Sequence, residues 1–124
     1  MARNILIVGE VAGGQPTSTT LELLGGAAAL AAGGTVGVTL LGSGASGAAA
    51  ACAGATQAYV SDDAAYDTFR GEQWLAAIDA ALDQSSVDLV LIAQSMAGRE
   101  IGPRLAHRRG TAVAMDCISI VDAD

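Results

Sequence analysis

Short runs of branched apolar residues recur along this chain, and this recurrence limits its fold more than any other sequence feature. The first run is residues 4–9 (NILIVG) and the second is residues 35–41 (TVGVTLL). Runs of this kind are typical of strands buried on both faces of a parallel sheet. Further strands are predicted at residues 57–60, 89–93, 111–115 and 118–121.

Helical patterns separate the predicted strands. Thr19 and Glu22 have the spacing of a capping box and begin a helix that runs to about Ala32. The other predicted helices are an alanine-rich one that ends at Ala53, one over residues 71–83, and one around Ile101 and Leu105 that Gly110 closes. This alternation predicts a three-layer α/β/α fold with a doubly wound, mainly parallel sheet in the strand order 3-2-1-4-5.

Size and charge limit what such a fold does. The chain has 124 residues, which is the size of one domain, and 52% of them are hydrophobic, which is enough for a core. It has 6 basic residues against 13 acidic ones, and its formal charge is -7 at pH 7. Because nucleic acids and anionic membranes are bound by basic surfaces, this balance argues against both as partners.

The expected location is the cytoplasm. No charged residue occurs between Glu22 and Asp62, but glycines cut this stretch into pieces too short to span a membrane. Cys52 and Cys117 lie far apart, without the spacing of a metal site or a disulfide framework. No export signal is visible in the first residues, so none is expected. We therefore expect reduced cysteines that act as small core residues, and no metal.

A glycine motif, Gly42-Ser-Gly44-Ala-Ser-Gly47, follows the second predicted strand and precedes a helix. With Asp62 about 20 residues further on, it matches the dinucleotide fingerprint. That fingerprint normally follows the first strand, and a chain rich in glycine and alanine produces such matches by chance. We therefore favour a structural turn there, and a solvated loop for Asp62, Asp63 and Asp67.

A better candidate for ligand binding is the point where the strand order reverses, because open α/β sheets bind ligands there, beyond the carboxyl ends of their strands. In the order 3-2-1-4-5 this point joins the loop of residues 10–16 to the loop of residues 94–99. The candidate ligand residues are Glu10, Gly13, Gly14, Ser95, Gly98 and Arg99. The second loop leads into a helix whose first amides attract an anion. The alternative is that Arg99 and Glu100 form a solvated helix start.

The last predicted helix concentrates basic side chains, namely Arg104, His107, Arg108 and Arg109. Cations near a helix C-terminus stabilise it, which explains them without a ligand. The alternative is a face that binds a partner protein. His107 has no nucleophile beside it in the sequence, so we expect no catalytic role for it. Trp74 has helical spacing with Leu75 and Ile78 and is expected in the core.

Residues 95–106 (SMAGREIGPRLA) place Gly98-Arg99 ahead of Pro103-Arg104-Leu-Ala106. This segment resembles the signature of the electron transfer flavoprotein alpha subunit, where a Gly-Arg or Gly-Lys pair precedes a Pro-Arg-Leu/Val-Ala run. The family's order is also matched by residues 5–8 (ILIV) with Glu10, residues 20–24 (TLELL), residues 41–44 (LGSG) and residues 115–118 (MDCI). The resemblance covers nearly the whole chain.

The resemblance implies that residues 1–124 form one N-terminal alpha-subunit domain with an adenine-nucleotide-hydrolase-like fold. In that family FAD sits mainly in the alpha subunit's C-terminal domain, and the beta subunit binds AMP or a second flavin. The C-terminal FAD domain is expected to be absent from these 124 residues, so the chain is expected to be either a fragment of a longer subunit or a related short protein. The resemblance therefore implies that this chain alone binds no cofactor and pairs with a beta subunit and a flavin domain in electron transport. The contacts are expected at the sheet edge and at the helix around Arg104, with Pro103 and Arg108 as further candidates.

Other interpretations remain open. The chain is alternatively a stand-alone adenine-nucleotide-binding module that uses residues 10–16 and 94–99. An enzyme has the least support, because the sequence contains no nucleophile–base pair or metal cluster. If the last predicted strand leaves a sheet edge or an apolar face uncovered, the chain is expected to self-associate.

Overall fold

The computed structural model describes residues 3–52, 54–84, 87–92 and 95–110, and its centre is a parallel sheet. The strands, in spatial order, are β5 (Gln57–Ser61), β4 (Val36–Leu41), β1 (Ile5–Val8) and β6 (Leu89–Ile92). On β1, Ile5 pairs with Val36 on one side and with Leu89 on the other. This order confirms the first four strands of the predicted 3-2-1-4-5 arrangement. The strands predicted at residues 111–115 and 118–121 lie outside the described residues.

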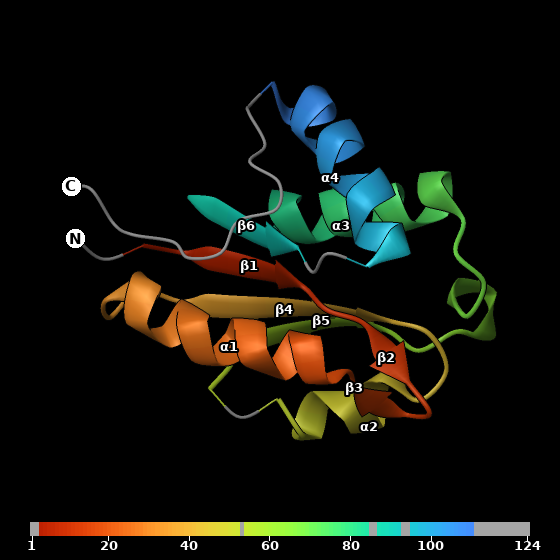
Figure 1. The fold of residues 1–124 in the computed structure, drawn as a ribbon, viewed down its shortest axis with the longest axis horizontal. Helices are drawn as coiled ribbons and strands as arrows, with labels where there is room; N and C mark the ends of the chain where they lie inside the picture. Colours follow the sequence, from red (N-terminus) through yellow and green to blue (C-terminus); the bar gives the residue numbers. More distant parts are fainter. Residues whose placement is uncertain (1–2, 53, 85–86, 93–94, 111–124) are drawn as a thin grey trace.

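Helices cover both faces of the sheet, as Figure 1 shows. On one face lie α1 (Ser18–Ala31) and α2 (Ala45–Ala50), and on the other lie α3 (Gly71–Asp83) and α4 (Met96–Arg109). The three layers confirm the predicted α/β/α fold. Within the described ranges, no helix is long and apolar enough to cross a bilayer.

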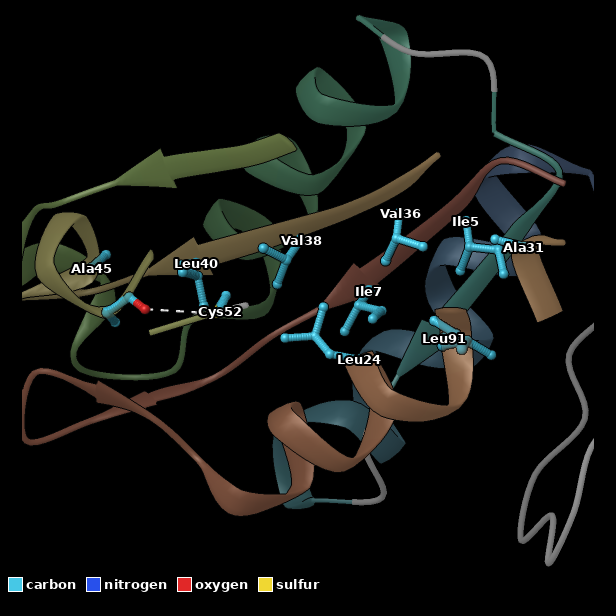
Figure 2. Packing of buried hydrophobic residues seen from close by; sticks show 12 residues of the cluster. Ile5, Ile7, Leu24, Ala31, Val36, Val38, Leu40, Ala45, Cys52 and Leu91 are labelled. Carbon is cyan, nitrogen blue, oxygen red and sulfur yellow. Dashed lines mark hydrogen bonds between the residues drawn. The ribbon is translucent and has the colours of Figure 1, made fainter. Parts of the chain in front are cut away.

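The core beneath α1 and α2 is built from branched strand residues and small helix residues. Ile5, Ile7, Val36, Val38 and Leu40 face Leu24 of α1 and the alanines of α1 and α2. Figure 2 shows these side chains gathered between the sheet and the two helices. Because alanine side chains are small, the backbones of α1 and α2 lie close to the sheet. Cys52 is buried here as predicted, and its thiol lies 3.6 Å from the Ala48 carbonyl oxygen.

The core beneath α3 and α4 uses larger side chains. Trp74, Leu75 and Ile78 of α3 meet Ile101 and Leu105 of α4 over the ends of β1 and β4. The buried position of Trp74 confirms its expected core role. Its ring packs against Phe69 in an edge-to-face pair with centroids 5.2 Å apart, one of the preferred aromatic geometries.

Two predicted helix starts were wrong. The cap of α1 is Thr17, whose hydroxyl accepts a hydrogen bond from the Thr20 amide, rather than Thr19. Likewise α4 begins at Met96, with Ser95 as its cap, so Gly98 and Arg99 lie in its first turn instead of in a loop. In both cases the deciding factor is which hydroxyl reaches the amide three residues ahead.

The other differences concern short elements. The loop after β1 contains a hairpin, β2 (Val11–Ala12) and β3 (Gln15–Pro16), that the sequence analysis missed. Helix α2 stops at Ala50, earlier than predicted. A 3-10 turn, η1 (Ala64–Tyr66), interrupts the loop predicted after β5. By contrast, α3 has the predicted bounds, and Gly110 closes α4 in the left-handed conformation.

Candidate functional site

The carboxyl ends of the parallel strands share one edge of the sheet, and the loops that leave them form the candidate site. Glu10 follows β1, and its backbone is held by the first turn of α1. The Glu10 amide donates to Thr20 Oγ1 at 2.9 Å, and the Thr17 amide donates to the Glu10 carbonyl at 3.0 Å. The path of the chain out of β1 is therefore fixed by α1.

The hairpin that follows carries two of the predicted ligand residues at its tip. Gly13 and Gly14 have φ angles of 59° and 76°, so both central turn positions are left-handed, as in the turns that favour Gly-Gly. The hairpin reaches toward α2 (Figure 1). There it meets Gly44, where a Cβ atom would lie only 2.7 Å from the Gly14 Cα atom. The hairpin and the glycine motif after β4 are thus packed backbone to backbone.

The glycine motif itself is held by two carboxylates from the loop after β5. Asp67 accepts from the Ser43 amide and from the Ser43 hydroxyl, both at 2.7 Å. Asp62 accepts from the Gly44 amide at 3.1 Å and from the Ser46 amide at 3.2 Å. These aspartates were predicted to form a solvated loop, and that prediction missed their contacts. In a dinucleotide site such amides would bind the pyrophosphate, whereas here in-chain carboxylates occupy them.

The same hydrogen bonds lower the pKa of both carboxyl groups. For Asp62 the largest cause is the Gly44 amide, followed by the Ser46 amide. For Asp67 it is the Ser43 hydroxyl, followed by the Ser43 amide. Hydrogen bonds donated to a carboxylate favour its charged form. Both groups are therefore anionic at neutral pH, and the motif is an anion-binding loop whose anions come from the chain itself.

The remaining predicted ligand residues lie at the start of α4. The Ser95 hydroxyl accepts from the Gly98 amide at 3.0 Å, while the Arg99 amide bonds to the Ser95 carbonyl at 2.9 Å. Gly98 is buried and Arg99 is exposed. Because β6 pairs with β1, this helix start lies next to the reversal of strand order, as predicted. It presents the positive end of a helix dipole there.

The basic side chains of α4 form ion pairs with α3. Arg104 pairs with Glu72 of α3 and with Glu100 of its own helix. Arg108 and Arg109 both pair with Asp79, and Arg109 reaches Asp83 at 3.1 Å. The sequence contained a signal for this contact, because Glu72, Asp79 and Asp83 recur at intervals of seven and four residues on one face of α3. Sequence reasoning assigned the arginines to the helix dipole and missed their partners.

No metal site accompanies these groups: among the described residues, His, Cys, Asp and Glu form no cluster that could hold a metal ion. The polar groups that the described part of the site offers are backbone amides, the Asp62 and Asp67 carboxylates and guanidinium groups.

Comparison with known proteins assigns the chain to a family. The family model described as the electron transfer flavoprotein domain matches residues 5–124. Among curated proteins, none matches this chain closely enough to count as a relative. The matched range includes every helix and strand described above, and such a domain indicates a role in flavin-linked electron transport. The chain therefore belongs to the electron transfer flavoprotein domain family.

Proposed function

We propose that this chain is the N-terminal, partner-binding domain of an electron transfer flavoprotein alpha subunit, and that it supports electron transfer through FAD held by another domain. The observation that carries the proposal is the occupied glycine motif. Asp62 and Asp67 accept hydrogen bonds from the amides of Ser43, Gly44 and Ser46, which a nucleotide phosphate would need. The loop that most resembles a phosphate-binding site is already occupied by carboxylates of the chain itself, which suits a domain with a supporting role.

The proposed contact surface for the beta subunit is the outer face of α4. Its charges are balanced within the α3–α4 layer by the ion pairs of Arg104, Arg108 and Arg109 with α3. The chain as a whole has a charge of -7, so a balanced face lets a partner approach without long-range repulsion. Pro103 is exposed in the middle of this face, and Arg104 is half-buried beside it.

The proposal is tested by reconstitution with a beta subunit and a flavin domain. Pro103→Glu is the informative variant, because Pro103 has no charge and its replacement leaves the α3–α4 ion pairs in place. We expect Pro103→Glu to weaken assembly by about tenfold or more, as a charge in the centre of an interface does. The readouts are the Kd of the complex and the retention of FAD by it.

Leu21→Glu is the matched control, since Leu21 is exposed on α1, in the opposite layer. It adds the same charge and should leave assembly unchanged. If the unmodified chain forms no complex with the beta subunit and the flavin domain, the proposed role is lost. If Pro103→Glu and Leu21→Glu changed the Kd of the complex equally, the contact with the beta subunit would not lie on α4.

A second candidate function is a stand-alone adenine-nucleotide module, favoured by the helix start at Ser95 beside the β1–β6 junction. A ligand that binds only the native state raises the melting temperature. Titration with AMP, ATP and FAD should then stabilise the chain, and Arg99→Ala should reduce the effect. Absence of any shift with all three nucleotides would eliminate this candidate.

A further inference from the structure

Strand β5 has a free edge in the part of the chain that the structure describes, because only β4 pairs with it there. Its sequence from Gln57 to Ser61 (QAYVS) contains no charged residue and no proline. Natural proteins usually protect an exposed strand edge with such residues, because unpaired backbone groups are a template for another strand. Strand β5 carries neither of these protective residue types.

The backbone groups that face outward are those of Ala58 and Val60. Gly42 directly follows β4, and its amide donates to the Ser61 carbonyl at 3.1 Å. The backbone groups of Ser61 therefore point toward β4. In a parallel ladder every second residue bonds to the same neighbour, which assigns Tyr59 to β4 as well. Val60 lies between Tyr59 and Ser61, and Ala58 precedes Tyr59. The backbone N–H and C=O groups of Ala58 and Val60 are therefore directed to the open edge.

We propose that β5 is a homodimerisation edge, at which β5 of a second copy pairs antiparallel with a two-fold axis at Tyr59. In this register Ala58 of one copy lies opposite Val60 of the other, and the pair exchanges both N–H···O bonds. The same happens on the other side of the axis. All outward-facing groups of the two residues are thereby satisfied.

Charge placement also favours a second copy in this register. Asp62 of one copy comes opposite Thr56 of the other, so no carboxylate faces a carboxylate across the new ladder. Strand β5 itself carries no charge. A surface that pairs with its own copy brings identical charges together, so in a chain of charge -7 such a surface must lack acidic side chains. Antiparallel pairing of the strand with its own copy meets this condition.

Apolar surface on both faces of the strand is covered in the dimer. Val60 is 37% exposed, and besides Leu21 it is the only large hydrophobic side chain that is exposed among the described residues. On the α3 side a groove of about 550 Å³ runs between β5 and α3, lined by Tyr59, Tyr66 and the alanines Ala76, Ala77 and Ala80. Tyr59 of the second copy lies directly beside this groove in the proposed register.

Sedimentation equilibrium over a concentration series tests the dimer. The unmodified chain should approach twice its 12.2 kDa mass, and more completely at high salt, because salt screens the repulsion between two acidic chains. Val60→Lys should raise the dimer Kd by about tenfold or more, since a lysine at the centre of an edge opposes pairing. Leu21→Lys, on α1, is the matched control and should leave the Kd unchanged.

A cross-linking experiment tests the register independently of Val60. In a background of Cys52→Ala and Cys117→Ala, Tyr59→Cys should form an intermolecular disulfide on mild oxidation. The two Cα atoms would be roughly 4.5 Å apart, within disulfide range. Gln57→Cys should not cross-link, because its copy would lie about 13 Å away along the strands.

Three results would overturn the proposal. The first is a chain that stays monomeric at the highest concentration and salt. The second is a folded Val60→Lys variant, judged by its circular dichroism, that dimerises as well as Leu21→Lys. The third is cross-linking of Gln57→Cys to the same extent as Tyr59→Cys.

Discussion

At the scale of single residues, two glycines that look alike in the sequence have opposite roles. Gly44 has a φ angle of 84° and packs on the Gly14 backbone, so a side chain there meets both strain and a clash. Gly47, three residues later, lies exposed within α2, and a Cβ atom built on it meets nothing within 4 Å. Only the first of these positions requires glycine.

Gly44→Ala should therefore destabilise the chain, and Gly47→Ala should stabilise it. We expect a loss of about 2 kcal/mol for Gly44→Ala, from the left-handed conformation and the contact with Gly14. Gly47→Ala should add about 0.5–1 kcal/mol, because alanine restricts the unfolded chain and favours the helix. Urea unfolding of both variants measures the two effects. A stable Gly44→Ala protein would mean that the hairpin does not pack on this loop.

At the scale of elements, two polar contacts join segments that the chain connects only through long paths. Asp62 and Asp67 hydrogen-bond the loop after β5 to the loop after β4. Asp79 joins α3 to α4 by an ion pair with Arg108. In each contact a carboxylate accepts hydrogen bonds or ion pairs from more than one donor. These acidic side chains therefore add polar links between elements that the apolar core also holds together.

The loop contact predicts a pH dependence. The folded pKa values of Asp62 and Asp67 are lowered, so their contribution to stability is present above the unfolded pKa of about 3.9 and is lost as the pH falls through the folded pKa values. The Asp62→Asn, Asp67→Asn double variant should lose stability at neutral pH and lose less than the unmodified chain on acidification.

The measurement is the free energy of unfolding in urea from neutral pH down to about pH 3, below the ordinary aspartate pKa. Glu22→Gln, which removes an exposed charge from α1, is the control and should keep the slope of the unmodified chain. Parallel curves for the double variant and the unmodified chain would show that the two aspartates do not hold the loop.

The helix contact predicts unequal effects of two neighbouring acids on α3. The Asp79 side chain is 17% exposed and receives two guanidinium groups, whereas that of Asp83 is 70% exposed and receives one. Asp79→Ala should cost about 1–2 kcal/mol, because it leaves Arg108 and Arg109 without a shared partner, and Asp83→Ala less than about 0.5 kcal/mol. A double-mutant cycle with Arg108→Ala measures the coupling. Equal costs for the two acids would exclude a special role for Asp79.

At the scale of the whole molecule, the two helical layers differ in character. Helices α1 and α2 contain a single charged residue, Glu22, and press small side chains against the sheet. Helices α3 and α4 carry larger core residues and an ion-paired outer surface. The proposed uses of the surface follow this division: α4 for a beta subunit, and the β5 edge between the layers for a second copy.

The sequence by itself determined the four strands of the parallel sheet, the presence of the helices between them and the three-layer arrangement, because buried parallel strands must be apolar and the helices between them must have one apolar face. Runs such as residues 4–9 and the spacing of Trp74, Leu75 and Ile78 record these local requirements directly. It also carried the family resemblance that the match over residues 5–124 supports.

Only the tertiary structure decided which polar groups meet. Asp62 and Asp67 lie about 20 residues from Ser43 and Gly44, and nothing in their local spacing predicts that they occupy the amides of the glycine motif. The same holds for Asp79 with Arg108, and for Gly14 against Gly44. Hydrogen bonds and close backbone contacts depend on distances of a few tenths of an ångström between segments. Such distances are set by the packing of the whole chain, whereas apolar periodicity is set within each segment.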